Sequence, residues 1–153
     1  MSLKEKISAD AITALKNHDK DTLGVLRMIK SKILELEVQL RDKKGKDYQL
    51  ADEETLGVIS SYAKQRKQSI DAYTEAGRMD LADQEIKELE ILSHYLPKQL
   101  SRKEVDKLVE AAIAATGASS MQDIGKVMKE LMPMLKGAAD GKMVNEIVRS
   151  MLR

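Results

Sequence analysis

The sequence of 153 residues contains no cysteine, no tryptophan and no phenylalanine. The lack of cysteine excludes disulfide bonds, thiolate catalysis and zinc sites built on thiolates. Four tyrosines are the only aromatic residues, so the chain has little surface on which the bases of a single-stranded nucleic acid could stack. Any contact with a nucleic acid is therefore expected to involve phosphates and backbone shape.

Long apolar runs are missing as well. No segment approaches the roughly 20 consecutive apolar residues that a membrane helix requires. Residues 1–10 alternate charged with small apolar residues and lack the apolar stretch of a secretion signal. We therefore expect a cytoplasmic protein without a membrane partner.

Neither sign of charge dominates, but the two signs are unevenly distributed. Charged residues make up 33% of the chain, and the formal net charge is +1. Residues 98–153 carry ten Lys or Arg against seven Asp or Glu, whereas residues 1–97 carry sixteen against eighteen. This mild basic bias of the last third fits either an ordinary solvated surface or a phosphate-binding face.

Only two prolines and eight glycines interrupt the chain, and apolar residues recur every three or four positions. This periodicity predicts an all-α fold. We expect an N-terminal helical bundle with long antiparallel helices over residues 1–97 and a small C-terminal three-helix tail domain over residues 98–153. The basic segment 41–47 is expected to be a loop or a frayed helix end. The predicted helices span residues 2–17, 19–40, 52–77, 79–93, 101–117, 120–132 and 140–152.

A charged cluster is predicted between the third and fourth helices. The two helices meet at Gly77, so residues equidistant from this glycine should lie opposite each other. Arg66 lies eleven residues before Gly77 and Glu88 eleven residues after it. We expect an ion pair between these side chains, with Glu85 as a second acceptor and Arg78 close enough to join. We interpret this cluster as structural and not catalytic, because it would set the register of two leucine-rich helices.

Catalytic constellations are not evident in the sequence. His18 and His94 fall at predicted helix ends, without a second histidine or a carboxylate at metal-ligand spacing. Gly125 and Lys126 lack the flanking residues of a nucleotide-binding loop. We therefore predict no catalytic residue, no metal and no cofactor, and expect that the chain alone is not an enzyme.

Basic residues gather on the last two predicted helices and the turn between them. Ile124, Val127, Met128 and Leu131 share one helix face, which leaves lysines on the opposite face. Asp140 is expected to cap the final helix. The candidate phosphate-binding residues are Lys126, Lys129, Lys136, Lys142 and Arg149. The alternative is that these residues form only the wet face of an amphipathic helix pair.

Two segments of the tail, residues 123–129 and 136–145, resemble the tail domain of the GatB/YqeY family. Further resemblance in the first two thirds is carried by Leu26, Arg27, Gln65, Arg66, Ser69, Ile70, Gly77, Arg78, Leu81, Glu85, Glu88, Leu89, Tyr95, Leu96 and Pro97. The resemblance covers essentially the whole chain. One departure is Ala138, at a position where the family usually has a basic residue.

The resemblance implies a free-standing relative of the C-terminal helical part of the amidotransferase B subunit, which holds tRNA while other domains transfer ammonia. The expected function is a non-catalytic accessory protein that binds tRNA, with an amidotransferase or other translation components as possible partners and no DNA. A family-level label of carbon–nitrogen ligase with glutamine as nitrogen donor would then describe the assembly. The alternative is a helical protein–protein interaction module that does not bind RNA.

Overall fold

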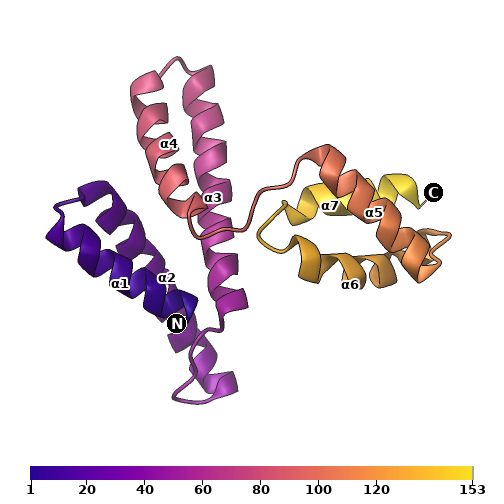
Figure 1. Cartoon of the computed structure of the whole chain (residues 1–153), viewed down its shortest axis with the longest axis horizontal. Helices are drawn as coiled ribbons and strands as arrows, with labels where there is room; N and C mark the ends of the chain where they lie inside the picture. The colour runs from indigo at the N-terminus through magenta and orange to yellow at the C-terminus, as the bar shows by residue number, and fades with distance from the viewer. Residues whose placement is uncertain (153) are drawn as a thin grey trace. The chain divides into compact units, whose positions relative to one another are not determined.

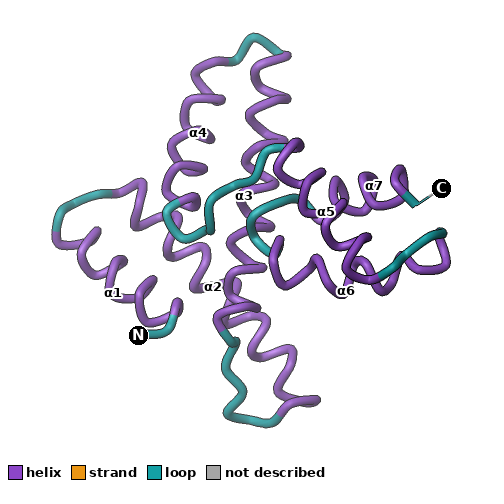
Figure 2. The backbone as a smooth tube through the Cα atoms, turned by 45° about the vertical axis from the view of Figure 1, so that its right-hand side comes forward, coloured by secondary structure: helices purple, strands orange, loops and turns teal. Residues whose placement is uncertain are grey.

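The computed structural model describes residues 1–152, and within them the chain forms seven α-helices, one short 3-10 helix and no strand (Figures 1 and 2). The all-α class predicted from the periodicity is confirmed. The elements are α1 (Leu3–Lys16), α2 (Lys20–Lys44), α3 (Asp52–Glu75), α4 (Met79–Ser93), α5 (Arg102–Thr116), the 3-10 helix η1 (Met121–Asp123), α6 (Ile124–Leu135) and α7 (Gly141–Met151).

The chain divides into two compact units, Met1–Leu96 and Pro97–Arg153. The first unit contains α1 to α4, and the second contains α5 to α7 with the 3-10 helix. Each unit has a hydrophobic core of its own.

The helices of the first unit begin where capping side chains satisfy the free backbone donors of the first turn. At α1 the Glu5 N–H donates to Ser2 Oγ at 3.2 Å, and the Ser2 N–H donates to Glu5 Oε2 at 2.8 Å. Asp19 caps α2 by accepting from the Thr22 N–H at 3.1 Å. α2 continues to Lys44, so most of the segment expected to be a loop or frayed end is helical.

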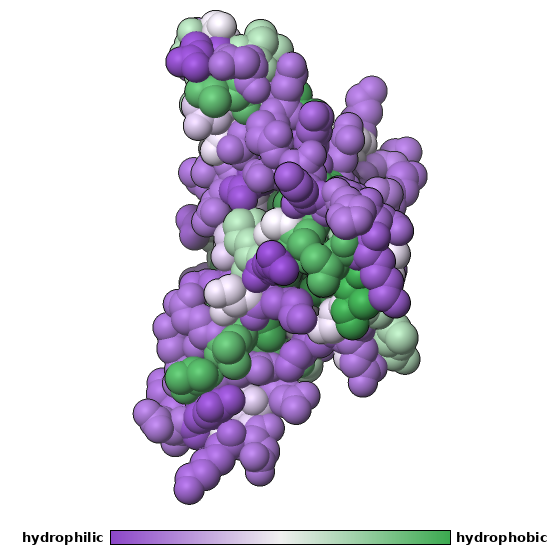
Figure 3. Space-filling model, turned by 90° about the vertical axis from the view of Figure 1, so that its left-hand side faces the viewer, coloured by the Kyte–Doolittle hydropathy of each residue, from purple (hydrophilic) through white to green (hydrophobic). Residues whose placement is uncertain are grey.

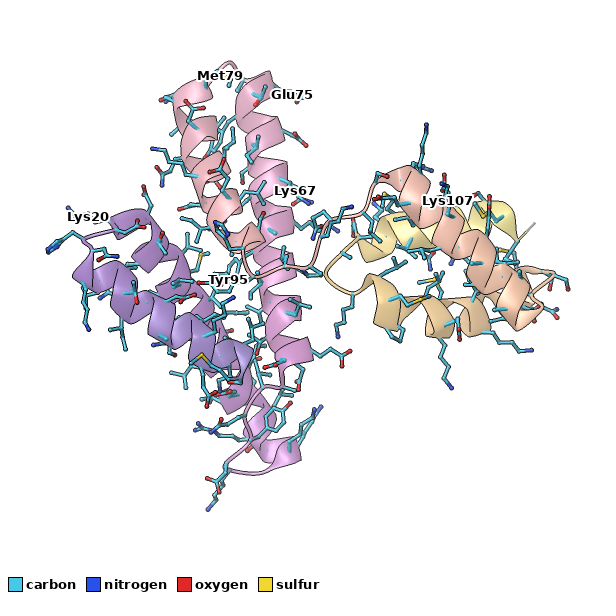
Figure 4. All side chains as sticks on the ribbon, in the orientation of Figure 1. Lys20, Lys67, Glu75, Met79, Tyr95 and Lys107 are labelled. Carbon is cyan, nitrogen blue, oxygen red and sulfur yellow. The ribbon has the colours of Figure 1, made fainter. Side chains whose placement is uncertain are left out.

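Two antiparallel helix pairs, α1 with α2 and α3 with α4, pack together in the first unit. The largest buried side chains between them include Ile7, Leu26, Ile29, Ile59 and Leu92. Burying each such side chain contributes about 1.5–3 kcal/mol to folding. Gly77, with φ of +70°, forms the turn between α3 and α4, whose tip is marked by Glu75 and Met79 (Figure 4).

A buried carboxylate holds the loop that leads into α3. Glu37 on α2 is 7% exposed, pairs with Lys4 on α1 and accepts from the Leu50 N–H at 2.9 Å. Desolvation acts to raise the pKa of Glu37, but the hydrogen bonds from Lys4 and Leu50 outweigh it and lower the pKa from 4.5. Glu37 therefore stays ionised while it joins α1, α2 and residues 45–51.

A second polar contact attaches the end of α4 to α1. The Tyr95 hydroxyl donates to Asp10 Oδ2 at 2.6 Å, and the Lys6 ammonium lies 5.5 Å from the centre of the Tyr95 ring (Figure 4). Burial, followed by the Asp10 carboxylate, raises the pKa of Tyr95. The tyrosine therefore remains a hydrogen-bond donor throughout the physiological range of pH.

The second unit is a compact arrangement of three helices. Ser101 and Glu104 form a capping box at the start of α5, and Gly117, with φ of +69°, ends this helix in the left-handed conformation. Val109 on α5, Leu131 on α6 and Val148 on α7 are completely buried. The three helices thus share one apolar centre and expose their polar faces to solvent.

Candidate nucleic-acid interface

α6 buries one apolar face and exposes two lysines on another. Val127, Leu131 and Leu135 are buried, at the spacing of one helix face. Lys126 and Lys129 lie one turn apart on the solvent side of the same helix. The burial of the apolar face therefore holds both ammonium groups in water.

α6 begins and ends later than the predicted helix over residues 120–132. The expected end was Met132, whereas the helix runs through Pro133 to Leu135. Proline has no N–H to donate to the carbonyl four residues earlier, but Pro133 lies on the exposed side, where water can satisfy that carbonyl. The extra turn brings Leu135 into the core, where it is 1% exposed.

The turn between α6 and α7 is fixed by the segment that precedes α5. The Leu100 N–H donates to the Ala138 carbonyl at 2.9 Å, and Gln99 Nε2 donates to the Gly137 carbonyl at 2.6 Å. Gly137 has φ of +77°, a conformation that favours glycine, and Ala138 is 6% exposed. Lys136 therefore extends from a turn whose backbone is held at two points.

α7 carries polar groups along one face. Asp140 caps the helix by accepting from the Lys142 N–H at 3.2 Å, as the sequence predicted. Lys142, Asn145 and Arg149 follow at the spacing of one helix face, and Arg149 Nε donates to Asn145 Oδ1 at 2.7 Å. This hydrogen bond orients the Arg149 guanidinium along the exposed face.

The five candidate cations differ in how far their charge is already neutralised. Lys126 Nζ lies 3.8 Å from Asp123 Oδ1, whose pKa is lowered chiefly by the Ser119 N–H and to a smaller extent by Lys126. Neither Lys129 nor Lys142 forms an ion pair with any residue of the described part of the chain. These two lysines keep their full charge for an anionic partner.

The charged cluster predicted between α3 and α4 lies in the first unit. Arg66 Nε lies 2.7 Å from Glu88 Oε2 and 3.3 Å from Glu85 Oε2. Arg66 Nη2 also lies 3.2 Å from the sulfur of Met28 on α2, and the guanidinium lies 6.0 Å from the centre of the Tyr62 ring. Arg66 therefore contacts side chains of three helices.

Arg78 does not belong to this cluster, contrary to the expectation from its closeness to Gly77. Its guanidinium pairs with Asp80 at 3.0 and 3.1 Å, and both side chains are more than half exposed. The hydrogen bonds from Arg78 lower the pKa of Asp80. A short contact with a residue two positions along the chain is reached more easily than a pair about two turns further down the hairpin.

Within residues 1–152, no group of three or more His, Cys, Asp or Glu side chains is arranged so that it could hold a metal ion. His94 follows the last turn of α4, and His18 follows α1 with φ of +56°. No helix in this part of the chain is long and apolar enough to cross a membrane.

Several residues that shape the second unit were not identified from the sequence. Gln99 and Leu100 hold the turn before α7, and Asn145 orients Arg149. Asp123, named from the sequence only as part of the segment 123–129, accepts from the Ser119 N–H and faces Lys126. Asp123 with Lys126 and Asn145 with Arg149 have a local signal, a spacing of three or four residues, whereas Gln99 and Leu100 have none.

Comparison with known proteins shows what the chain is similar to. A model of the YqeY-like protein family matches residues 4–152. An uncharacterised protein of Schizosaccharomyces pombe is 28% identical over 100 residues, which cover 65% of this chain and 76% of that protein. A protein of Pyrenophora tritici-repentis, named altered inheritance of mitochondria protein 41, mitochondrial, is 25% identical over 150 residues, which cover 96% of this chain and 79% of that protein. Because the family model matches nearly the whole chain, the protein belongs to the YqeY-like family.

Proposed function

We propose that the second unit binds tRNA through its phosphate backbone. The observation that carries the proposal is the set of cations on the solvent side of α6 and α7 and on the turn between them. The set comprises Lys126, Lys129, Lys136, Lys142 and Arg149. All four tyrosines lie before residue 97, so the second unit has no aromatic side chain on which a base could stack. Such a surface can bind RNA by contacts between its cations and the phosphates.

The role that fits this surface is that of a non-catalytic accessory protein. The family resembles the helical part of the amidotransferase B subunit, and on that basis the partners are tRNA and an amidotransferase or another translation component. We include in this proposal the cytoplasmic location that is expected from the sequence. The word mitochondrial describes the relative from Pyrenophora tritici-repentis.

The test is a titration of the protein with bulk tRNA over a series of salt concentrations. Three phosphate contacts would give a slope of log affinity against log salt of about −2 to −3. The variant Lys126→Glu/Lys129→Glu/Lys142→Glu is expected to lose this binding and most of the slope. A matched control, Arg102→Glu/Lys103→Glu/Lys107→Glu, changes the charge by the same amount on exposed positions of α5 and is expected to retain binding.

Two results would contradict the proposal. Equal losses in both triple variants would mean that tRNA responds to overall charge and not to α6 and α7. Absence of salt-dependent binding would favour the alternative function, a protein interaction module. That alternative has one observation in its support, since Met132 and Met134 are exposed on α6 although methionine usually fills cores or adaptable binding surfaces.

A further inference from the structure

Four aliphatic side chains lie exposed where α1 and α2 meet, on the side facing away from the core of the first unit. Ile12 and Leu15 on α1, and Leu34 and Val38 on α2, are each more than half exposed. Figure 3 views the molecule from the side on which α1 and α2 lie in Figure 1, and hydrophobic surface interrupts a largely hydrophilic face there. Single exposed aliphatic residues are ordinary, whereas several of them along one pair of helices indicate a contact surface.

A depression of about 440 Å³ lies within this surface. Its lining includes Ser8 and Ser31, whose small side chains leave room between the two helices, together with Leu34. Ile12 follows Ser8 by one helical turn and Val38 follows Leu34 by one turn, so the exposed aliphatic residues continue the line of the depression. We call this surface, from Leu15 and Ile12 across Ser8 to Leu34 and Val38, the α1/α2 groove.

The charges around the α1/α2 groove are predominantly positive. Arg27, Lys30 and Arg41 project from the same side of α2 as Leu34. No ion pair joins Arg27 or Lys30 to a residue in the range 1–152, whereas Arg41 acts electrostatically on Glu37. The nearby carboxylate of Glu37 is buried and neutralised by Lys4. An apolar line with unpaired cations beside it is complementary to a helix that has leucines on one face and carboxylates next to them.

We propose that the α1/α2 groove is a docking surface for an acidic amphipathic α-helix of a partner protein. A second copy of this chain fits less well, because a two-fold contact would bring Arg27, Lys30 and Arg41 towards the same residues of the copy. RNA fits less well too, because phosphates give the exposed aliphatic side chains nothing to pack against. The proposal concerns the first unit and does not depend on tRNA binding by the second.

The experiment uses two helix-stabilised, fluorescent peptides of about 18 residues, roughly five turns. One carries leucines on a single face with glutamates beside them, and the other has lysines in place of the glutamates. Fluorescence anisotropy with the full chain is expected to show that the glutamate peptide binds at least about tenfold more tightly, a difference of about 1.4 kcal/mol.

Two variants of the groove and one control variant test where the glutamate peptide binds on the protein. Leu34→Ser/Ile12→Ser removes two exposed side chains and is expected to weaken the glutamate peptide about tenfold or more. Arg27→Glu/Lys30→Glu is expected to reverse the preference towards the lysine peptide. As the matched control, Lys126→Glu/Lys129→Glu on the second unit is expected to leave the affinity unchanged.

The opposite results would overturn the proposal. They are no binding of either peptide, equal affinity for both, or an affinity that the groove variants leave unchanged. Light scattering that shows a dimer abolished by Leu34→Ser would instead assign the groove to a second copy. Competition by tRNA for the glutamate peptide, retained in the variant of the second unit, would assign the groove to RNA.

Discussion

The contacts of Arg66 lead to a quantitative prediction about the stability of the first unit. The Arg66 Nε atom lies 2.7 Å from Glu88 and 3.3 Å from Glu85, and the three side chains are 16%, 25% and 20% exposed respectively. At an effective dielectric constant of about 20, unit charges roughly 3–4 Å apart attract each other by about 4–5 kcal/mol. Desolvation offsets part of this attraction, but removing Arg66 would also leave two carboxylates facing each other.

We therefore expect Arg66→Met to lower the free energy of unfolding by about 2–3 kcal/mol, somewhat less than for a fully buried pair. Methionine replaces the aliphatic stem of the arginine but not its guanidinium, so the loss includes the contacts of that group with Met28 and the Tyr62 ring as well as the two ion pairs. The double variant Arg66→Met/Glu88→Gln should recover about 1–2 kcal/mol relative to the sum of the two single variants.

The assay is urea unfolding of the whole chain, followed by tyrosine fluorescence. All four tyrosines lie in the first unit, so this signal reports its unfolding separately from that of the second. Arg78→Met is the matched control, because it removes an arginine whose partner is the exposed Asp80, and no measurable change is expected. An Arg66→Met variant as stable as Arg78→Met, or a double variant whose loss is simply additive, would refute the reasoning.

Two further predictions concern Glu37 and the glycines of the first unit. Because the folded-state pKa of Glu37 is lowered from 4.5, its contribution is present above that value and is lost as the pH falls through the folded pKa. The free energy of unfolding of the wild type should therefore fall more steeply below pH 4.5 than that of Glu37→Gln, measured by urea unfolding at each pH. Parallel pH profiles would contradict this assignment. Gly77→Ala should destabilise the first unit by about 1 kcal/mol, because its φ of +70° strains a residue with a Cβ. Gly57→Ala, in α3 with open space around the added Cβ, should stabilise it by up to about 1 kcal/mol, and melting curves that show the same sign for both would contradict the argument.

The two proposed binding surfaces lie on separate units and are complementary to different kinds of partner. The cations of α6 and α7 suit a phosphate backbone, whereas the α1/α2 groove combines exposed aliphatic side chains with cations and suits a helix. Each surface has its own set of variants, so the two proposals can fail independently.

Most helix boundaries could be predicted from the sequence, because the signals that begin and end a helix are local. The capping boxes at Ser2 and Ser101 and the turn at Gly77 each depend on residues within a few positions of one another. The opposed positions of Arg66 and Glu88 could be inferred as well, since a tight turn between two helices relates residues at equal distances from it.

The polar contacts between distant parts of the chain could not be predicted in the same way. Glu37 lies between Leu36 and Val38 on α2 and has no local sign of burial, yet it accepts a hydrogen bond from the Leu50 N–H and pairs with Lys4. The bonds of Gln99 and Leu100 to the turn before α7 span 38 residues along the chain. Such partners are chosen by packing of the apolar faces, which brings distant backbone groups together and requires each buried polar group to find a partner.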